Sequence, residues 1–189
     1  GLLEPDAYDL AGAATGIVSA DRLLGPDRVR AGDVVIAMRS SGLHSNGYSL
    51  ARHVLLTVAR LPLDSTADLG VPLGEVLLTP TRIYARDCLA LAAAVEVHAL
   101  CHVTGGGLTA NLARVLPPGL TASIDRASWT PDPIFDLIAE RGGVAAEEME
   151  RTFNLGVGMV AVVPENAAHA ALALLAQRDV DAWVAGTIT

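Results

Sequence analysis

Apolar and polar residues come in blocks along the chain, and these blocks predict strands and helices in alternation. Short runs rich in Val, Ile and Ala predict strands at 11–18, 33–38, 97–103, 120–125 and 182–188, and another in the second half of 153–164. Apolar residues at helical spacing predict helices at about 47–60, 131–143 and 165–178, with short ones after 107 and through 149. Residues 62–76 are rich in Pro, Gly and Asp and predict a loop.

One further helix is predicted from its starting signal. Thr79 followed by Pro80 is typical of an N-cap and a proline in the first helical turn, so a helix is expected from there to about Val95. Together the elements predict one domain, 1–189, of α/β (α+β) class, with a mixed β-sheet flanked by helices. No repeat or internal boundary interrupts it.

Charge and composition narrow the classes of partner. The net charge of −8 and the pI near 4.9 argue against a nucleic-acid or anionic-membrane partner. All 13 basic residues are arginine, so a Schiff-base lysine and the lysine of a Walker A loop are excluded within this chain. A bound anion therefore needs arginine, histidine, hydroxyls, backbone N–H groups or a metal ion.

The sequence also predicts where in the cell the protein is located and whether the chain is part of a longer protein. The sequence contains neither an apolar run long enough to cross a membrane nor a signal-peptide pattern, and a cytoplasmic protein is expected. Cys88 and Cys101 lie in apolar surroundings and are predicted to be buried free thiols, with a disulfide left open. Because the chain opens at Gly1 rather than at methionine, a piece of a longer polypeptide is expected.

The most polar stretch, "RSSGLHSNGYSL", lies between the strand at 33–38 and the helix at 47–60. A turn from a buried strand into a helix start exposes backbone N–H groups that attract anions. Glycines there permit close approach of a ligand, and hydroxyl, amide and imidazole groups add partners. The candidate ligand-binding residues of this first loop are Ser40, Ser41, Gly42, His44 and Asn46.

A second loop, "HVTGGGL", repeats the plan of strand, glycines and helix start, with candidates Thr104, Gly105, Gly106 and Gly107. Two such loops predict a small phosphate-bearing ligand held in one cleft at one edge of the sheet. Arg82 is expected in the first turn of its helix, where it opposes the helix dipole and indicates an anionic partner nearby. His44 is expected to help most when it is protonated.

Each of these residues also has an ordinary interpretation. The serines and Asn46 suit helix caps, and three glycines suit a flexible connection. His44 and His102 fit ordinary loop and strand-end positions, and Arg82 fits a surface ion pair. Asn154, after Phe153, fits a turn. These patterns alone predict only the binding of a small anionic ligand.

Four strings in order carry a stronger signal: "SSGLHSNGYSLAR", "LLTPTRIYA", "HVTGGGLTANLARVLP" and "RTFNLGVGM". Together they resemble the C-terminal half of the phosphoribosylformylglycinamidine cyclo-ligase family, also called aminoimidazole ribonucleotide synthetases, from about Tyr8 to the end. Ala110 departs from the family, which commonly carries a glutamate there, before the asparagine matched by Asn111. That departure weakens the case for a catalytic carboxylate at this position.

The resemblance implies an ATP-dependent enzyme of purine biosynthesis. Its family closes the imidazole ring of 5-aminoimidazole ribonucleotide: ATP phosphorylates the formyl oxygen of formylglycinamidine ribonucleotide, an amidine-side nitrogen attacks, and phosphate leaves. ATP and Mg²⁺ are implied as cofactors, bound mainly by an N-terminal domain that this chain lacks and that makes most of a homodimer contact. The residues here, Asn154 included, would chiefly bind the ribonucleotide, and the isolated chain is expected to be inactive in ring closure.

Two alternatives stay open. The first is selenophosphate synthetase, since it shares the architecture and an "SNG" helix start. The same architecture is shared by formylglycinamidine ribonucleotide synthetase, thiamin-phosphate kinase and a hydrogenase-maturation protein. The second is a non-catalytic phosphate-ligand-binding module.

Overall fold

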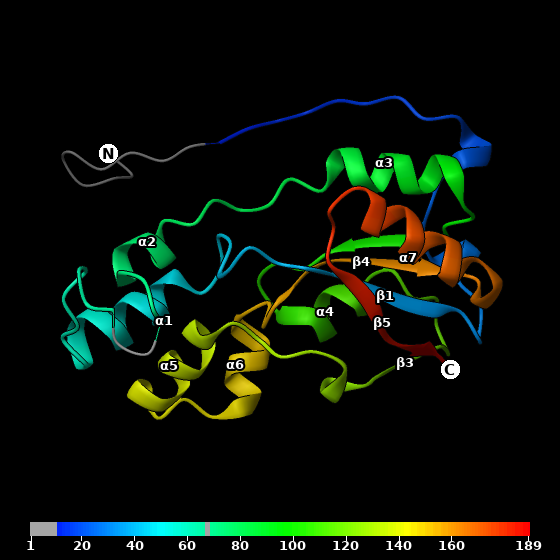
Figure 1. The fold of residues 1–189 in the computed structure, drawn as a ribbon. Helices are drawn as coiled ribbons and strands as arrows, with labels where there is room; N and C mark the ends of the chain where they lie inside the picture. Colours follow the sequence, from blue (N-terminus) through cyan, green and yellow to red (C-terminus); the bar gives the residue numbers. More distant parts are fainter. Residues whose placement is uncertain (1–10, 67–68) are drawn as a thin grey trace, which may run out of the picture.

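A computed structural model describes residues 11–66 and 69–189 and centres on a five-stranded sheet (Figure 1). Its strands are β1 (Val34–Arg39), β2 (Ala99–His102), β3 (Ala122–Ile124), β4 (Val157–Val163) and β5 (Ala182–Ile188). They lie in the order β2-β4-β1-β5-β3, and all four pairings are antiparallel. The predicted class, a sheet flanked by helices, is confirmed. The sheet was predicted to be mixed, and the pairings among the described residues are all antiparallel.

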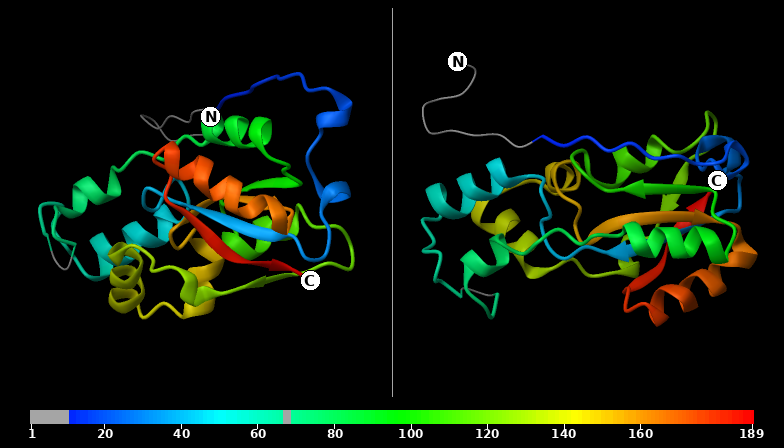
Figure 2. Two further views of the ribbon diagram at one scale, coloured as in Figure 1. Left: turned by 45° about the vertical axis from the view of Figure 1, so that its right-hand side comes forward. Right: turned by 90° about the horizontal axis from the view of Figure 1, so that it is seen from above.

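The central strand β1 is buried because helices cover both faces of the sheet. Val34, Ile36 and Met38 point to one face, where α3 (Ala85–Ala94) and α7 (Ala168–Gln177) pack (Figures 1 and 2). Val35 and Ala37 point to the other face, where α4 (Gly107–Ala113) packs. A strand buried on both sides reads as a continuous apolar run, which is why "VVIAM" was easy to predict.

A helical lobe lies beside the sheet and has its own apolar core. It contains α1 (Tyr48–Arg52), which continues as a π-helical segment, η3 (His53–Val58). With it are α2 (Leu73–Leu77), α5 (Pro133–Gly142) and α6 (Ala146–Thr152). Their shared core includes Leu55, Leu73, Ile138 and Phe153. An extended connection, residues 78–84, runs from α2 in this lobe to α3 on the sheet (Figure 1).

Short 3-10 turns complete the chain: η1 (Ala20–Arg22), η2 (Pro26–Arg28), η4 (Arg126–Ser128) and η5 (Glu165–Ala167). The structure confirms five of the predicted strands, those predicted from 33, 97, 120 and 182 and the one ending near 163. It also confirms the helices predicted near 47–60, 131–143 and 165–178 and the two short helices. Residue 8, where the family resemblance begins, lies outside the described residues.

Three predictions of local structure are wrong. Residues 11–18 form no strand: Ile17 is 102% exposed, and the described part of the chain offers this segment no partner strand. The predicted loop at 62–76 contains the short helix α2. The helix expected from Thr79 begins only at Ala85. The Pro80 carbonyl, which would accept a helical N–H, accepts the Ser41 hydroxyl instead, and the Thr79 hydroxyl donates to the Glu75 carbonyl of α2.

Candidate functional site

The two polar loops lie next to each other at one edge of the sheet. Both β1 and β2 run antiparallel to β4, so these two strands end at the same edge and their following loops leave it together. A Cβ placed on Gly105 would lie 3.5 Å from Asn46 Oδ1, and the rings of His44 and His102 have centroids 6.4 Å apart. The predicted meeting of the two loops is therefore confirmed in position, while a shared ligand stays a prediction.

Three aromatic rings gather between the loops. The ring centroids of His44, Tyr84 and His102 lie 6.2 to 6.4 Å from one another. Two of them, Tyr84 and His44, pack over Gly158 of β4, where a Cβ would come within 2.0 Å of Tyr84 Oη and 2.7 Å of His44 Cε1. Only glycine at that position leaves room for the rings. We call His44, Tyr84 and His102 the ring cluster.

His44 is held as a neutral imidazole. Its Nε2 accepts the backbone N–H of Ser41 at 3.0 Å, so in the neutral ring the proton is on Nδ1. Burial lowers the pKa of His44, and the neighbouring His102 lowers it further. Both effects oppose the cationic form that was expected to help binding most, as does the acceptor role of Nε2 in a residue that is only 5% exposed. Nδ1 is buried and has no partner among the described residues.

Ser41 ties the first loop to the extended connection 78–84. Its hydroxyl donates to the Pro80 carbonyl at 2.7 Å and accepts the backbone N–H of Arg82 at 3.0 Å. Beside it, Ser45 Oγ lies 3.2 Å from Thr81 Oγ1. Neither serine caps a helix, since the N-cap of α1 is Gly47 and receives no side-chain hydrogen bond. The capping interpretation is therefore wrong for this loop.

Asn154 organises the first loop from within. Its Oδ1 accepts from the Ser40 hydroxyl and the Gly156 N–H, and its Nδ2 donates to the carbonyls of Gly42 and Leu43. The residue is 4% exposed, and both oxygen and nitrogen are fully used. Asn154 thus shapes the loop, and any effect on a ligand passes through Ser40 and Gly42.

The second loop is built in a similar way around a buried asparagine. Asn111 Nδ2 donates to the carbonyls of Thr104, Gly105 and Gly107, and its Oδ1 accepts from the Thr104 hydroxyl. Gly107 has φ +65°, and a Cβ there would lie 1.7 Å from the Glu150 carbonyl oxygen. Gly105 is exposed, whereas Gly107 is buried. The glycines therefore allow close packing against the end of α6, and they also leave room for a ligand.

Arg82 precedes α3 and does not lie inside it, so the argument from an unfavourable helix dipole does not hold. Its Nη2 lies 3.8 Å from Asp87 Oδ2 and donates to the Asp179 carbonyl at 3.3 Å. Its Cζ lies 5.9 Å from the centroid of the Tyr84 ring, and Nε is buried with no partner among the described residues. Arg82 is thus a cation beside the ring cluster, and its Nε–H donor is not used by any described residue.

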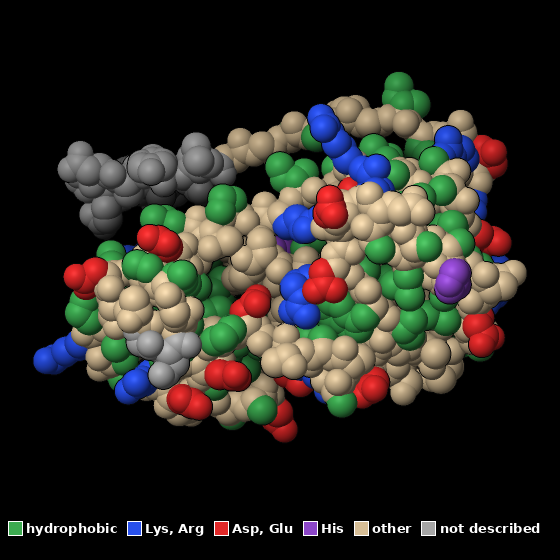
Figure 3. Space-filling view, viewed as in Figure 1, with side chains coloured by type: hydrophobic (Ala, Val, Ile, Leu, Met, Phe, Trp, Pro, Cys, Tyr) green, Lys and Arg blue, Asp and Glu red, His purple; other side chains and the backbone are tan. Residues whose placement is uncertain are grey.

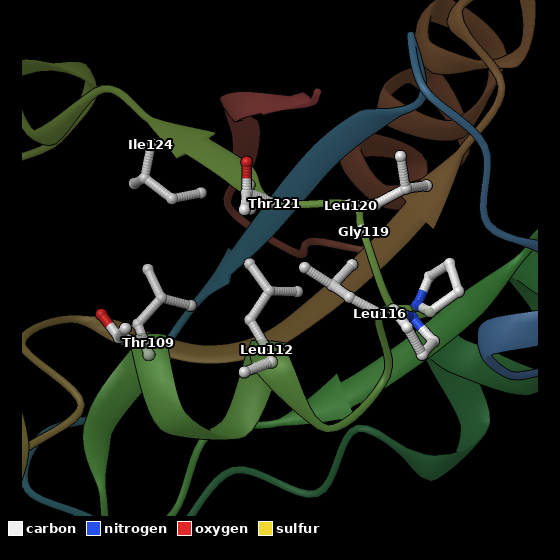
Figure 4. Close-up of a pocket in the computed structure, with 12 residues that line it drawn as sticks. Thr109, Leu112, Leu116, Gly119, Leu120, Thr121 and Ile124 are labelled. Atoms are coloured by element: carbon white, nitrogen blue, oxygen red, sulfur yellow. The ribbon is translucent and has the colours of Figure 1, made fainter.

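Several cavities lie outside the meeting point of the loops, and two of them differ in their relation to the site. One, of about 240 Å³, lies against Ser40, Ser41 and Gly42 and includes Asp132, whose pKa is raised by burial against the opposing effect of Arg39. The other, of about 450 Å³, is apolar and lies between α4 and β3, with Leu112 and Leu116 on one side and Ile124 on the other (Figure 4). The second cavity is lined by none of the predicted site residues.

Sequence reasoning missed the contributions of Tyr84, His102, Gly158 and Thr81, and it placed Asn154 in contact with the ligand. The second glycine of "GVGM", inside an otherwise apolar strand, is a signal for close approach by other groups. Tyr84 and Thr81 belong to "TPTRIY", where the predicted helix concealed their role in the extended connection.

Comparison with known proteins connects this geometry to a family. The family model of the AIR synthase related protein, C-terminal domain, matches residues 30–189. The chain belongs to this family. The match contains both loops, the ring cluster, Arg82 and Asn154, so the site as a whole lies inside the family domain.

Several relatives of this family member are named as phosphoribosylformylglycinamidine cyclo-ligases. A Streptomyces fradiae protein provisionally named phosphoribosylformylglycinamidine cyclo-ligase is 60% identical over 162 residues, covering 85% of this chain and 89% of that protein. Phosphoribosylformylglycinamidine cyclo-ligases of Symbiobacterium thermophilum and Sorangium cellulosum are 49% and 51% identical over the whole chain. The chain spans 54% and 55% of their lengths, about half.

Solved structures support the fold of this AIR synthase-related domain. Thiamine-monophosphate kinase from Stenotrophomonas maltophilia matches with a TM-score of 0.58 at 21% identity, over 91% of this chain and 52% of that one. HypE from E. coli matches with a TM-score of 0.56 at 21% identity, over 87% and 46%. At these identities the likeness concerns architecture alone. Among residues 11–66 and 69–189, no helix is long and apolar enough to span a bilayer.

Proposed function

We propose that this chain is the C-terminal part of an ATP-dependent cyclo-ligase that converts formylglycinamidine ribonucleotide to 5-aminoimidazole ribonucleotide in purine biosynthesis. The observation that carries the proposal is the meeting of the two polar loops around the ring cluster, within a domain whose relatives bear that name. The selenophosphate synthetase alternative has only shared architecture behind it.

In this proposal the chain's own residues bind and orient the ribonucleotide. Neutral His44 offers an Nδ1–H donor that lacks a partner, and an unpaired buried donor costs about 1–3 kcal/mol. An acceptor atom on the ligand would remove that cost. Arg82 supplies the positive charge for the phosphate. Asn46 and Gly105 lie where the two loops meet, and Thr104 precedes Gly105 in the second loop. Ser40, Gly42 and Asn154 set the loop shape, and Gly106 and Gly107 let α4 begin close to the second loop.

The described residues do not fit a magnesium–ATP site. No group of three or more His, Cys, Asp or Glu side chains is arranged to hold a metal ion in this part of the chain, and lysine is absent from the sequence. In this proposal ATP and Mg²⁺ bind mainly in an N-terminal domain of the longer protein. A cytoplasmic homodimer built through that domain completes the proposal.

The test is ATP-dependent ring closure by a protein that carries this chain as its C-terminal half, compared with the 189-residue chain alone. The longer protein is expected to form 5-aminoimidazole ribonucleotide, and the chain alone is expected to form none. Turnover by the chain alone would contradict the assigned division of labour. Binding of formylglycinamidine ribonucleotide without turnover by the longer protein would favour a non-catalytic binding module.

A further inference from the structure

Arg82 shares the carboxylate of Asp87 with a second arginine. Asp87, in the first turn of α3, is 9% exposed and faces two guanidinium groups. Arg178, at the end of α7, brings Nε to 2.9 Å from Asp87 Oδ1, a charged hydrogen bond. Arg82 Nη2 lies at 3.8 Å from Asp87 Oδ2, beyond hydrogen-bond reach. Asp87 therefore interacts more strongly with Arg178 than with Arg82.

The charges do not cancel within this group. Arginine stays protonated in proteins, so Arg82 and Arg178 contribute two positive charges against the single negative charge of Asp87. The neighbouring turn does not neutralise Arg82 either. Asp179 gives it a backbone carbonyl, and the carboxylate of Asp181 is bound by Arg39 at 2.5 Å. One unit of positive charge remains, in a chain whose net charge is −8.

Arg82 is also fixed in place on the site side. Its backbone N–H is bound by Ser41 of the first loop, and its guanidinium lies over Tyr84 of the ring cluster. Its Nε–H is buried with no partner in the described part of the chain. Figure 3 shows basic and acidic side chains grouped near the junction between the helical lobe and the sheet. An arginine that is oriented but incompletely paired is suited to take an anionic group.

We propose that Arg178 is a positioning residue for the anionic group of the substrate: by occupying Asp87, it keeps Arg82 oriented yet available to bind that group. This inference rests on the proposed function, because the anion is taken to be the phosphate of the ribonucleotide. Without Arg178, Asp87 becomes free to pair directly with Arg82 and to withdraw its charge from the ligand.

The ligand experiment uses a cyclo-ligase that carries this chain and measures formylglycinamidine ribonucleotide affinity by calorimetry. Arg178→Gln is expected to weaken binding by about tenfold, on the scale of one charge-assisted hydrogen bond. Arg178→Lys is expected to retain most of the affinity. The double variant Arg178→Gln/Asp87→Asn is expected to recover to within about threefold of the parent, because the competing carboxylate is gone. Arg86→Gln, an exposed change of the same charge in the same helix turn, is the control.

If Arg178 has a purely structural role, the double variant will bind the ribonucleotide no better than Arg178→Gln does. That result would overturn the proposal. A second measurement needs no ligand. Arg82→Gln is expected to destabilise the folded protein more in the Arg178→Gln background than in the parent, since Arg82 then carries the ion pair. Equal losses in both backgrounds would also overturn it. If the parent itself does not bind the ribonucleotide, the proposed function fails, while the stability comparison still decides whether the two arginines compete.

Discussion

His44 Nε2 accepts the backbone N–H of Ser41, a residue three positions earlier that also anchors the connection to α3. This bond requires an unprotonated Nε2, and His44 adopts φ +58° to make it. The imidazole is therefore part of the loop's framework, and its charge state is coupled to folding.

The first prediction concerns pH and His44. Its pKa is lowered in the folded protein relative to an unfolded value of about 6.5, so the unfolded chain binds more protons as pH falls. The stability contributed by neutral His44 is complete above about pH 6.5 and is lost as pH falls through the lower folded pKa. Urea unfolding of the parent and of His44→Asn at pH 8 and 5.5 measures this; asparagine tolerates the positive φ.

The free energy of unfolding of the parent should fall more on acidification than that of His44→Asn. His169→Asn, which changes an exposed histidine on α7, should follow the parent. Identical pH dependence in the parent and in His44→Asn would show that His44 is not held neutral by folding.

The second prediction concerns Gly158. Alanine there places a Cβ against Tyr84 Oη and His44 Cε1, so Gly158→Ala should destabilise the protein by about 1–3 kcal/mol through overpacking. The loss should be smaller in a Tyr84→Phe background, where the nearest atom is gone. Chemical denaturation measures both. Gly16→Ala, at an exposed position with nothing within 4 Å, should change stability by less than about 0.5 kcal/mol.

The third prediction concerns Asn154. Asn154→Ala removes the partner of Ser40 and leaves two carbonyls and one N–H of the buried loop unpaired, so a loss of about 2–4 kcal/mol is expected. Asn154→Asp keeps the acceptor but presents a carboxylate to the carbonyls of Gly42 and Leu43, and should also be unstable. A fully stable Asn154→Ala protein with weakened ligand affinity would instead indicate direct ligand contact.

The fourth prediction concerns the two thiols. Cys88 and Cys101 are buried and free, and burial raises the pKa of each to about 11, so at pH 8 roughly one thiol in a thousand is ionised. Labelling with a disulfide reagent at pH 8 should be slow in the native protein and complete in urea. Cys88→Ala should halve the signal in urea. Rapid reaction of two thiols in the native state would show that these positions open readily.

The predictability of this fold followed the strength of each local pattern. Strand β1 and helix α5 were found because apolar runs with clear boundaries identify them. The segment 11–18 carries the same kind of signal but lies exposed, since a strand also needs a neighbour, and a neighbour is not a property of the segment itself. Thr79–Pro80 failed similarly: no helix begins there, and the Pro80 carbonyl is bound by Ser41, a residue distant in the sequence.

The sequence predicted which loops form the site, and it did not predict the protonation state and contacts of the side chains in them. Ser41, His44 and the second loop were identified from polar residues between apolar elements. The neutral state of His44 follows from a bond to Ser41 that no spacing rule expresses. The ring cluster joins residues 44, 84 and 102, and the Arg82–Asp87–Arg178 group joins a connection to a turn about 90 residues later. Such contacts appear only once the sheet order is known.

The position of β1 in the middle of the sheet has a consequence for biosynthesis. Its two neighbours, β4 and β5, begin at Val157 and Ala182, so β1 is synthesised well before the two strands that pair with it. Pairing between such distant segments folds slowly, because a long loop must close before any contact forms. Until then, the apolar residues of "VVIAM" have neither a strand on each side nor helices on both faces. During this interval the exposed apolar surface and the unpaired edges of β1 favour aggregation of the nascent protein.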